Sequence, residues 1–374
     1  MNEGLSSSLG EELQDDFDFE RTDRQLALLA EHITDLCVVH AHIGRIRNQH
    51  VYINRLPFEI LARIFGFSVY RIEAEQEQPT VFPLILGRVC HRWRSVAWAS
   101  PELWASFHCQ ILKTRCSAQA LLLQEWLERS QQRPLSIRIS FQNEDAWIES
   151  TDSSPAIIEA ILPHCERWQS LDLILPKAWY DKLNEAQGRV SNLISLSIRS
   201  PGTKPPMLEF HTFETTTIRH FFASRYCLDD IYIRWDLLET VVLQHFTTRE
   251  GVEAIRRCKN VISCRLTDLD DDDGIFPGYA TNTSLRTLNV SVINYADLGA
   301  LLDFLILPEL DDLTVTLPNG HSFPLSTIEA FMRLSICPLK TITIEGVDID
   351  DEDLADFIKD NDSIRTVRVK PSIY

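Results

Sequence analysis

A short apolar pattern recurs along the second half of the chain, and it constrains the fold more than any other feature of the sequence. The pattern reads apolar-x-x-apolar-x-apolar. Its nine copies are Trp168-Leu171-Leu173, Leu193-Leu196-Ile198, Ile218-Phe221-Ala223, Leu238-Val241-Leu243, Val261-Cys264-Leu266, Leu285-Leu288-Val290, Leu310-Leu313-Val315, Leu339-Ile342-Ile344 and Ile364-Val367-Val369. The first residues of successive copies are 20 to 29 residues apart, which is the spacing of stacked strand-and-helix repeats. A repeat domain is therefore expected.

Amphipathic segments lie between the copies and predict return helices. They are Glu250 to Cys258, Tyr295 to Leu305, Ser326 to Leu334 and Asp351 to Ile358. An earlier strand is expected over Pro134 to Phe141, with helices over Ala118 to Arg129 and Pro155 to Cys165. Because a helix crosses over after each strand, neighbouring strands must run parallel. Residues 110–374 are thus expected to form a β/α array of stacked units, a solenoid with a parallel sheet.

One face of this sheet is expected to be free of helices. The residue before the second apolar position points to that face, and seven of the nine are Ser or Thr, as expected of a solvated sheet. The next outward column is more varied, and variety on an open face suits specific binding. Aromatic and Arg side chains dominate interface hot spots. The candidates for contacts with a target protein are Arg199, Phe222, Arg265 and Arg368.

The N-terminal segment divides into two parts. Residues 1–20 are rich in Ser, Gly and acidic side chains and lack apolar periodicity, which predicts disorder. Over residues 21–50 a line of mainly apolar side chains recurs at alternating steps of three and four, which predicts an amphipathic helix. These side chains are Leu26, Leu29, Ile33, Leu36, His40 and Ile43. The seam suits either a short coiled coil or packing against a neighbouring helix of the same chain.

Residues 51–109 have the pattern of a small helical module. Pro57 suits the first position of a helix. The apolar side chains that follow share one face: Ile60, Leu61, Ile64 and Phe65. A polar loop is expected from Gly66 to Pro83, a second helix from Leu84 to Ala97, and a last helical turn that ends at Trp104.

This module resembles the F-box, in the variant common in fungal proteins. The residues that carry the resemblance are Leu56-Pro57, Glu59-Ile60-Leu61, Ile64-Phe65, Val89-Cys90, Trp93-Arg94 and Pro101-Glu102-Leu103-Trp104. The resemblance implies docking on a Skp-type adaptor, and through it on a cullin, in a RING ubiquitin ligase. The side chains that it assigns to the adaptor contact are Leu56, Pro57, Ile60, Leu61, Phe65 and Trp93. Two features depart from the F-box pattern: the loop that follows Phe65 is long, and Phe58 stands in place of a small residue or proline. Trp93 and Trp104 suit an interface and a helical core equally.

The second half of the chain resembles leucine-rich repeats. That pattern has Asn or Cys three residues after the third apolar position, where it satisfies turn backbone groups. Here Val347 stands at that place in one copy, and Pro201 and Pro318 stand there in others. A less regular array is therefore expected. The fold class that follows is α/β, with a small all-α F-box-like module before a leucine-rich-repeat-like solenoid.

Charge and cysteine content restrict the partners. The net charge is -18, with 54 acidic against 36 basic residues, which argues against nucleic-acid binding. The nine cysteines include no Cys-x-x-Cys pair, which predicts reduced thiols and neither a zinc site nor a disulfide framework. The N-terminus lacks a signal sequence, and no membrane span is expected. A cytoplasmic or nuclear protein with protein partners is expected.

Catalytic signatures are missing from the sequence. It has no Gly-x-Ser-x-Gly elbow, P-loop, dinucleotide glycine fingerprint or His-Glu-x-x-His helix. No cofactor is therefore expected, and the chain is expected to be a recognition adaptor and not an enzyme. The alternative is a non-catalytic leucine-rich-repeat scaffold whose F-box-like helices only cap the repeats, and adaptor binding would distinguish the two.

Overall fold

A computed structural model describes residues 8–73, 82–141, 154–202, 211–270, 276, 278–318, 323–347 and 349–370. These residues divide into two compact units. The N-terminal unit ends at Ser100, and the C-terminal unit takes up the chain at Pro101. Each unit has its own core.

The N-terminal unit is all-helical. Its elements are α1 (Ser8–Gln49), the 3₁₀ helix η1 (Tyr52–Arg55), α2 (Phe58–Glu73), α3 (Phe82–Val89) and α4 (His91–Trp98). Its core contains Leu61, Phe65, Leu86 and Val96, each at most 5% exposed. The Phe65 and Trp93 rings lie 4.9 Å apart, so the first and last helices of the F-box-like segment pack on each other.

Three local predictions for this unit differ from the structure. Residues 8–20, expected to be disordered, belong to α1; acidic side chains near a helix N-terminus favour helix, because the helix dipole is positive there. Of the loop expected from Gly66 to Pro83, residues 66–73 belong to α2 and residues 82–83 to α3, and those between lie outside the described residues. The single helix expected from Leu84 to Ala97 is two helices, separated at Cys90, whose sulfur accepts a hydrogen bond from the Trp93 backbone N–H at 3.5 Å and so caps α4.

Helix α1 is exposed along most of its length. Every described side chain from Phe19 to Ile43 is exposed. Among the described helices, α1 has the one stretch, Phe19–Gln49, that is long and apolar enough by composition to cross a membrane, and none of that stretch is buried. Length and composition alone are weak grounds for a membrane span, because the buried core helix of a soluble protein and a signal sequence pass the same test.

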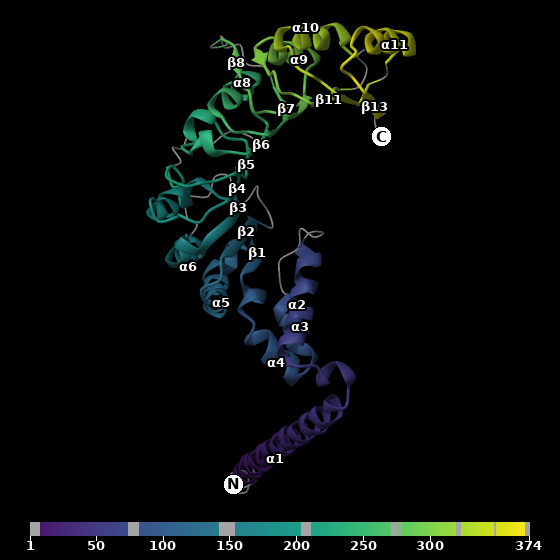
Figure 1. The fold of residues 1–374 in the computed structure, drawn as a ribbon. Coiled ribbons are helices and arrows are strands. Elements are labelled where there is room, and N and C mark those ends of the chain that lie inside the picture. The colour runs from purple at the N-terminus through teal and green to yellow at the C-terminus, as the bar shows by residue number, and fades with distance from the viewer. Residues whose placement is uncertain are drawn as a thin grey trace. The chain divides into compact units, whose positions relative to one another are not determined.

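The C-terminal unit is built on an eleven-stranded parallel sheet in which strands follow one another in chain order (Figure 1). The strands are β1 (Ser106–Ile111), β2 (Leu135–Phe141), β3 (Trp168–Ile174), β4 (Ser195–Arg199), β5 (His220–Ser224), β6 (Thr240–Gln244), β7 (Ser263–Leu269), β9 (Thr287–Val292), β11 (Asp312–Thr316), β12 (Thr341–Glu345) and β13 (Thr366–Lys370). The predicted parallel sheet is thus confirmed. Its first strand, β1, begins before residue 110, where the repeat region was expected to start.

Helices connect the strands and lie along one side of the sheet (Figure 1). They are α5 (Cys116–Arg129), α6 (Ala156–Ile161), α7 (Tyr180–Leu183), α8 (Thr248–Arg257), α9 (Tyr295–Leu302), α10 (Leu325–Ser335) and α11 (Asp351–Asp360). Short 3₁₀ turns complete several connections, and β8 (Ala280–Thr281) and β10 (Leu305–Ile306) form a separate two-stranded parallel sheet. The mixed α/β class is confirmed.

The nine copies of the apolar pattern coincide with the nine strands of the large sheet that follow β2. Their equivalent positions pair in register: Leu171 with Leu196, Leu196 with Phe221, and so on through Ile342 with Val367. The second and third apolar positions are almost fully buried in every copy but the last. In β13, Val369 is 42% exposed, so the last copy contributes less to the core.

A recurring turn ends or follows four strands of the large sheet. Residues with positive φ follow or end the strands at Arg225 (61°), His245 (56°), Asp268 (53°) and Gly346 (89°). The next residue is buried and apolar in each case: Tyr226, Phe246, Leu269 and Val347. A left-handed residue thus turns the chain, and an apolar side chain fills the space beneath it.

This turn predicts opposite effects for two Gly→Ala substitutions. A Cβ at Gly346 would collide with the carbonyl oxygen of Leu317 and would sit on a residue with φ of 89°, so Gly346→Ala should lower the free energy of unfolding by about 1 to 3 kcal/mol. Gly299 lies within α9 with open space around its Cβ position, so Gly299→Ala should raise it by about 0.5 to 1 kcal/mol. Urea unfolding followed by circular dichroism measures the free energy of unfolding of both variants. If the two substitutions change it equally, the turn described at Gly346 is wrong.

Candidate functional site

The predicted adaptor-binding residues fall into two groups. Ile60 is 46% exposed and Pro57 is exposed, while Leu56 and Trp93 are half-buried. Leu61 and Phe65 are 0% and 2% exposed. These two side chains lie in the core of the unit and support the surface above them, and their contact with an adaptor stays a prediction.

Helix α2 presents an exposed apolar line that extends beyond the predicted residues. Ile60, Ile64 and Phe67 are 46%, 38% and 65% exposed, and their spacing of four and three places them on one side of the helix. Phe67 was missed because it lies where a loop was expected, although the same spacing continued through it. Helix α3 adds exposed apolar side chains at Leu84, Ile85 and Val89. Apolar side chains this exposed are typical of a protein-binding surface.

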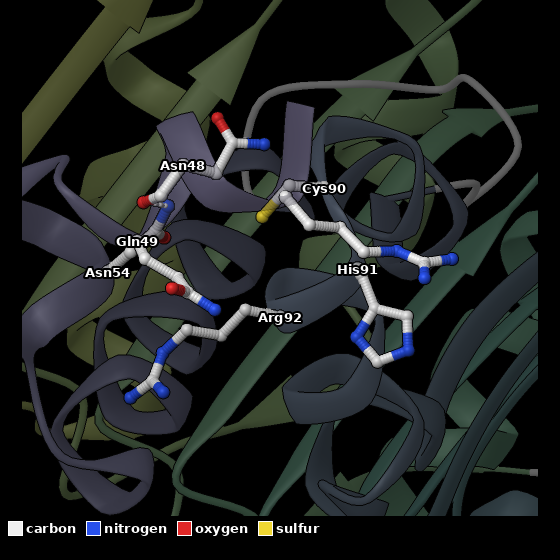
Figure 2. A pocket seen from close by; sticks show the side chains of 7 residues that line it. Asn48, Gln49, Asn54, Cys90, His91 and Arg92 are labelled. Atoms are coloured by element: carbon white, nitrogen blue, oxygen red, sulfur yellow. Dashed lines mark hydrogen bonds between the residues drawn. The ribbon is translucent and has the colours of Figure 1, made fainter. Parts of the chain in front are cut away.

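A small polar cavity of about 190 Å³ lies within the same unit (Figure 2). Figure 2 shows Asn48, Gln49 and Asn54 on one side of it and Cys90 and His91 on the other; Arg45 and Arg92 complete the lining. This lining contains no carboxylate.

Hydrogen bonds across this cavity join its walls. Asn54 donates from Nδ2 to the Asn48 carbonyl at 2.8 Å, and its Oδ1 accepts from the Trp93 indole N–H at 2.8 Å. Arg92 donates to the Leu56 carbonyl. The bonds tie the end of α1 and η1 to α4, so the cavity is best explained as a structural junction that orients Trp93 and Leu56.

The helix-free face of the C-terminal unit carries the four predicted target-binding residues. Phe222, Arg265 and Arg368 lie at equivalent positions of β5, β7 and β13, because the register joins their column from strand to strand. Arg199 lies on β4 two residues beyond this column, where it pairs with Ser224. Arg265 and Arg368 are exposed, and Arg199 and Phe222 are half-buried.

The structure brings two of these four residues into one depression. Arg265 and Arg368 line a depression of about 580 Å³ that crosses β7, β9, β11, β12 and β13. Between them the lining is mostly hydroxyl and amide side chains, including Asn289, Thr314 and Thr343. Arg199 and Phe222 do not line it. The depression suits hydrogen bonding to an extended polypeptide.

Neighbouring charges leave the two arginines available. Lys370 donates to Glu345 at 2.8 Å and Thr316 donates to the same carboxylate at 3.2 Å; the Lys370 bond, more than the Thr316 bond, holds the pKa of Glu345 below its usual value. The negative charge of Glu345 is thus already compensated by Lys370. In the part of the chain that the structure describes, neither Arg265 nor Arg368 has an ion pair or a side-chain hydrogen bond.

Four potentially nucleophilic groups of the C-terminal unit lie in or against its core. Burial raises the pKa of the Cys109 thiol to about 11 and that of Cys264 to about 12. Tyr180 and Tyr226 share a buried hydroxyl hydrogen bond, and burial raises the pKa of both well above the usual value. All four groups therefore stay protonated at neutral pH. The described residues also contain no group of three or more His, Cys, Asp or Glu side chains arranged to hold a metal ion.

The cavity junction predicts a local effect of Asn54→Ala. Losing both of its hydrogen bonds should destabilise the packing of α4 by about 1 to 2 kcal/mol, which corresponds to amide exchange roughly 5 to 30 times faster in α4. Hydrogen exchange measured by mass spectrometry on peptides from residues 82–100 tests this. Asn48→Ala is the control, because Asn48 takes part through its backbone oxygen alone; equal acceleration in both variants would rule out the assigned role.

Comparison with known proteins identifies no relative. No protein-family model matches the sequence, and no curated protein matches it either. The function is therefore inferred from the residues, the fold and the surfaces described above.

Proposed function

We propose that this chain is a substrate-recognition adaptor of a cullin–RING ubiquitin ligase. In this proposal the N-terminal unit docks on a Skp-type subunit, and the C-terminal unit forms a leucine-rich-repeat-like solenoid that binds a target protein. Ubiquitin transfer is left to other subunits, so the chain itself is non-catalytic and uses no cofactor. The proposed location is the cytoplasm or the nucleus.

The observation that carries the adaptor role is the two-sided character of α2. Leu61 and Phe65 are buried on one side, while Ile60, Ile64 and Phe67 are exposed on the other. The buried side keeps the helix in place, and the exposed side offers apolar area that gains free energy when a partner covers it. This segment is also the one whose sequence resembles the F-box.

Trp93 links the two sides. Its ring packs 4.9 Å from that of buried Phe65, its indole N–H is bonded to Asn54, and the residue stays half-buried. A large aromatic side chain fixed in this way is pre-organised for an interface, because little conformational freedom is left to lose on binding.

The observation that favours target binding is the composition of the helix-free face. A row of hydroxyl and amide side chains presents donors and acceptors, and two exposed arginines stand at its ends with no ion pair among the described residues. Both arginines are predicted target contacts. Because parallel strands lie about 4.8 Å apart, four strand spacings separate the arginines by roughly 19 Å, which is about the length of a six-residue extended segment.

The adaptor role is tested by replacing exposed side chains only. The double variant Ile60→Ser, Phe67→Ser should bind a purified Skp-type adaptor at least roughly tenfold more weakly than the parent chain, because each position contributes apolar contact area. Isothermal titration or co-purification measures the loss. Circular dichroism should be unchanged, because both side chains are exposed.

The matched control is Leu121→Ser, Leu122→Ser, which removes two side chains of α5 that are 66% and 68% exposed. It should bind the adaptor as the parent does. If the folded parent does not bind the adaptor at all, the ligase role is wrong, and a non-catalytic leucine-rich-repeat scaffold becomes the better account.

The target-binding face is tested by site-specific photo-cross-linking. A cross-linking amino acid at Thr314, in the depression, should capture a protein other than the adaptor, whereas the same group at Arg333, an exposed position on α10, should not. Adding Arg265→Glu and Arg368→Glu to the Thr314 probe should reduce capture about tenfold, because the arginines are the expected anchors. Capture that is equal at both positions, or unaffected by the two substitutions, would place target binding elsewhere.

A further inference from the structure

Helix α1 carries an unpartnered apolar seam. Five side chains, Leu26, Leu29, Ile33, Leu36 and Ile43, are 58%, 58%, 60%, 68% and 51% exposed. A line of large apolar side chains this exposed is unusual on a soluble helix unless another surface covers it.

The spacing of the seam identifies the surface that would cover it. The seam positions advance by three and four residues in alternation, counting His40 between Leu36 and Ile43, and this average of 3.5 residues is the period of a left-handed coiled coil. In heptad terms Leu26, Ile33 and His40 occupy position a, and the other three occupy position d. Ile33 at position a, between Leu29 and Leu36 at position d, has the arrangement that favours two parallel strands, whereas Leu26 at a and Ile43 at d depart from it.

We propose that α1 pairs with α1 of a second copy of this chain as a parallel two-stranded coiled coil along this seam. An identical helix has the same period and can match the seam along its whole length. His40 would then face His40 of the second copy, and a polar residue at one a position fixes the register at some expense of affinity. The pairing does not depend on the proposed ligase role.

The area available is sufficient for a weak, specific dimer. A fully buried Leu or Ile side chain removes on the order of 100 Å² of apolar surface from water, so the half-exposed seams of two helices offer about 600 Å². Phe19, Val39 and Ile46 are 74%, 54% and 45% exposed and extend or flank the seam. Including them brings the total to about 1,000 Å², which is where specific interfaces begin.

The charges of α1 favour a second helix over a lipid bilayer. Glu31 and Asp35 lie within the same apolar stretch, and at about 100° per residue they fall on the side opposite the seam. A paired helix leaves both carboxylates in water. Insertion into a membrane would bury both of them in hydrocarbon, where ionised side chains are strongly disfavoured.

Adjacent leucines provide a matched test of the seam. Leu28 and Leu29 are 54% and 58% exposed, yet only Leu29 lies on the seam, because neighbouring residues point about 100° apart. The full-length parent should sediment at twice the 43.0 kDa of one chain at micromolar concentration. Leu29→Glu with Leu36→Glu should weaken association by roughly 100-fold or more, whereas Leu28→Glu with Val38→Glu, the same chemical change off the seam, should leave it dimeric.

The histidines give a second matched pair. His40→Ile should tighten the dimer, because an apolar side chain replaces a polar one at an a position, while His42→Ile, which lies off the seam, should not. For the orientation, Thr22→Cys in a Cys37→Ser background should form a disulfide-linked dimer in a glutathione buffer, because a parallel in-register pair brings the two Thr22 positions together.

Each remaining outcome decides against the proposal. The seam pairing is wrong if the parent chain stays monomeric at about 50 micromolar. It is also wrong if the seam and off-seam variants lose association equally while circular dichroism shows unchanged helicity. If the parent floats with vesicles of phosphatidylcholine and phosphatidylserine, and forms no dimers when vesicles are absent, α1 is instead assigned to a membrane surface. If the Thr22→Cys variant is dimeric in solution but forms no disulfide-linked dimer on oxidation, the helices do not pair in parallel.

Discussion

Backbone hydrogen bonding between successive parallel strands is the constraint on which the C-terminal unit depends. Each strand pairs with the next in register, and the pairing continues just before the strands, where Ile194 N–H bonds to the Gln169 carbonyl and Glu239 N–H to that of Arg219. A strand that joins this ladder must present its apolar side chains on the same face as its neighbour. The apolar pattern therefore has to recur once per strand, and the connections between strands are free to vary in length and sequence.

Much of this unit could be predicted because the same physical requirement is repeated nine times. One copy of the pattern would have been ambiguous, but nine copies specify the strands, their register and the residues of the open face. The first strand was missed although Trp104-Phe107-Cys109 has the same spacing and β1 joins the same register. Its residues had been assigned to the end of the F-box-like segment, and a buried Trp104 packed 4.7 Å from Trp126 is a core residue of the C-terminal unit.

The turns and the candidate adaptor surface were harder to predict, for different reasons. A positive φ at Arg225, His245 or Asp268 is not visible in sequence, because most Arg, His and Asp residues have negative φ even though Asp and His adopt positive φ more often than other side-chain-bearing residues; tertiary packing of the next apolar side chain holds them there. On α2, helical periodicity places Ile60, Leu61, Ile64 and Phe65 near one another but does not say which edge of that group the rest of the unit covers. The break at Cys90 also had no local signal, since neither Pro nor Gly marks it.

Chain-order strand pairing also determines how the C-terminal unit can open. Since every strand of the large sheet bonds only to the strands that come before and after it within that sheet, formation of each contact closes a short loop, which favours rapid, stepwise folding. The same property separates the stability of the ends from that of the middle. β13, with its half-exposed Val369 and a single neighbouring strand, can detach while β5 to β9 stay closed, so a protease or chaperone would meet partly opened chains that still retain most of their sheet.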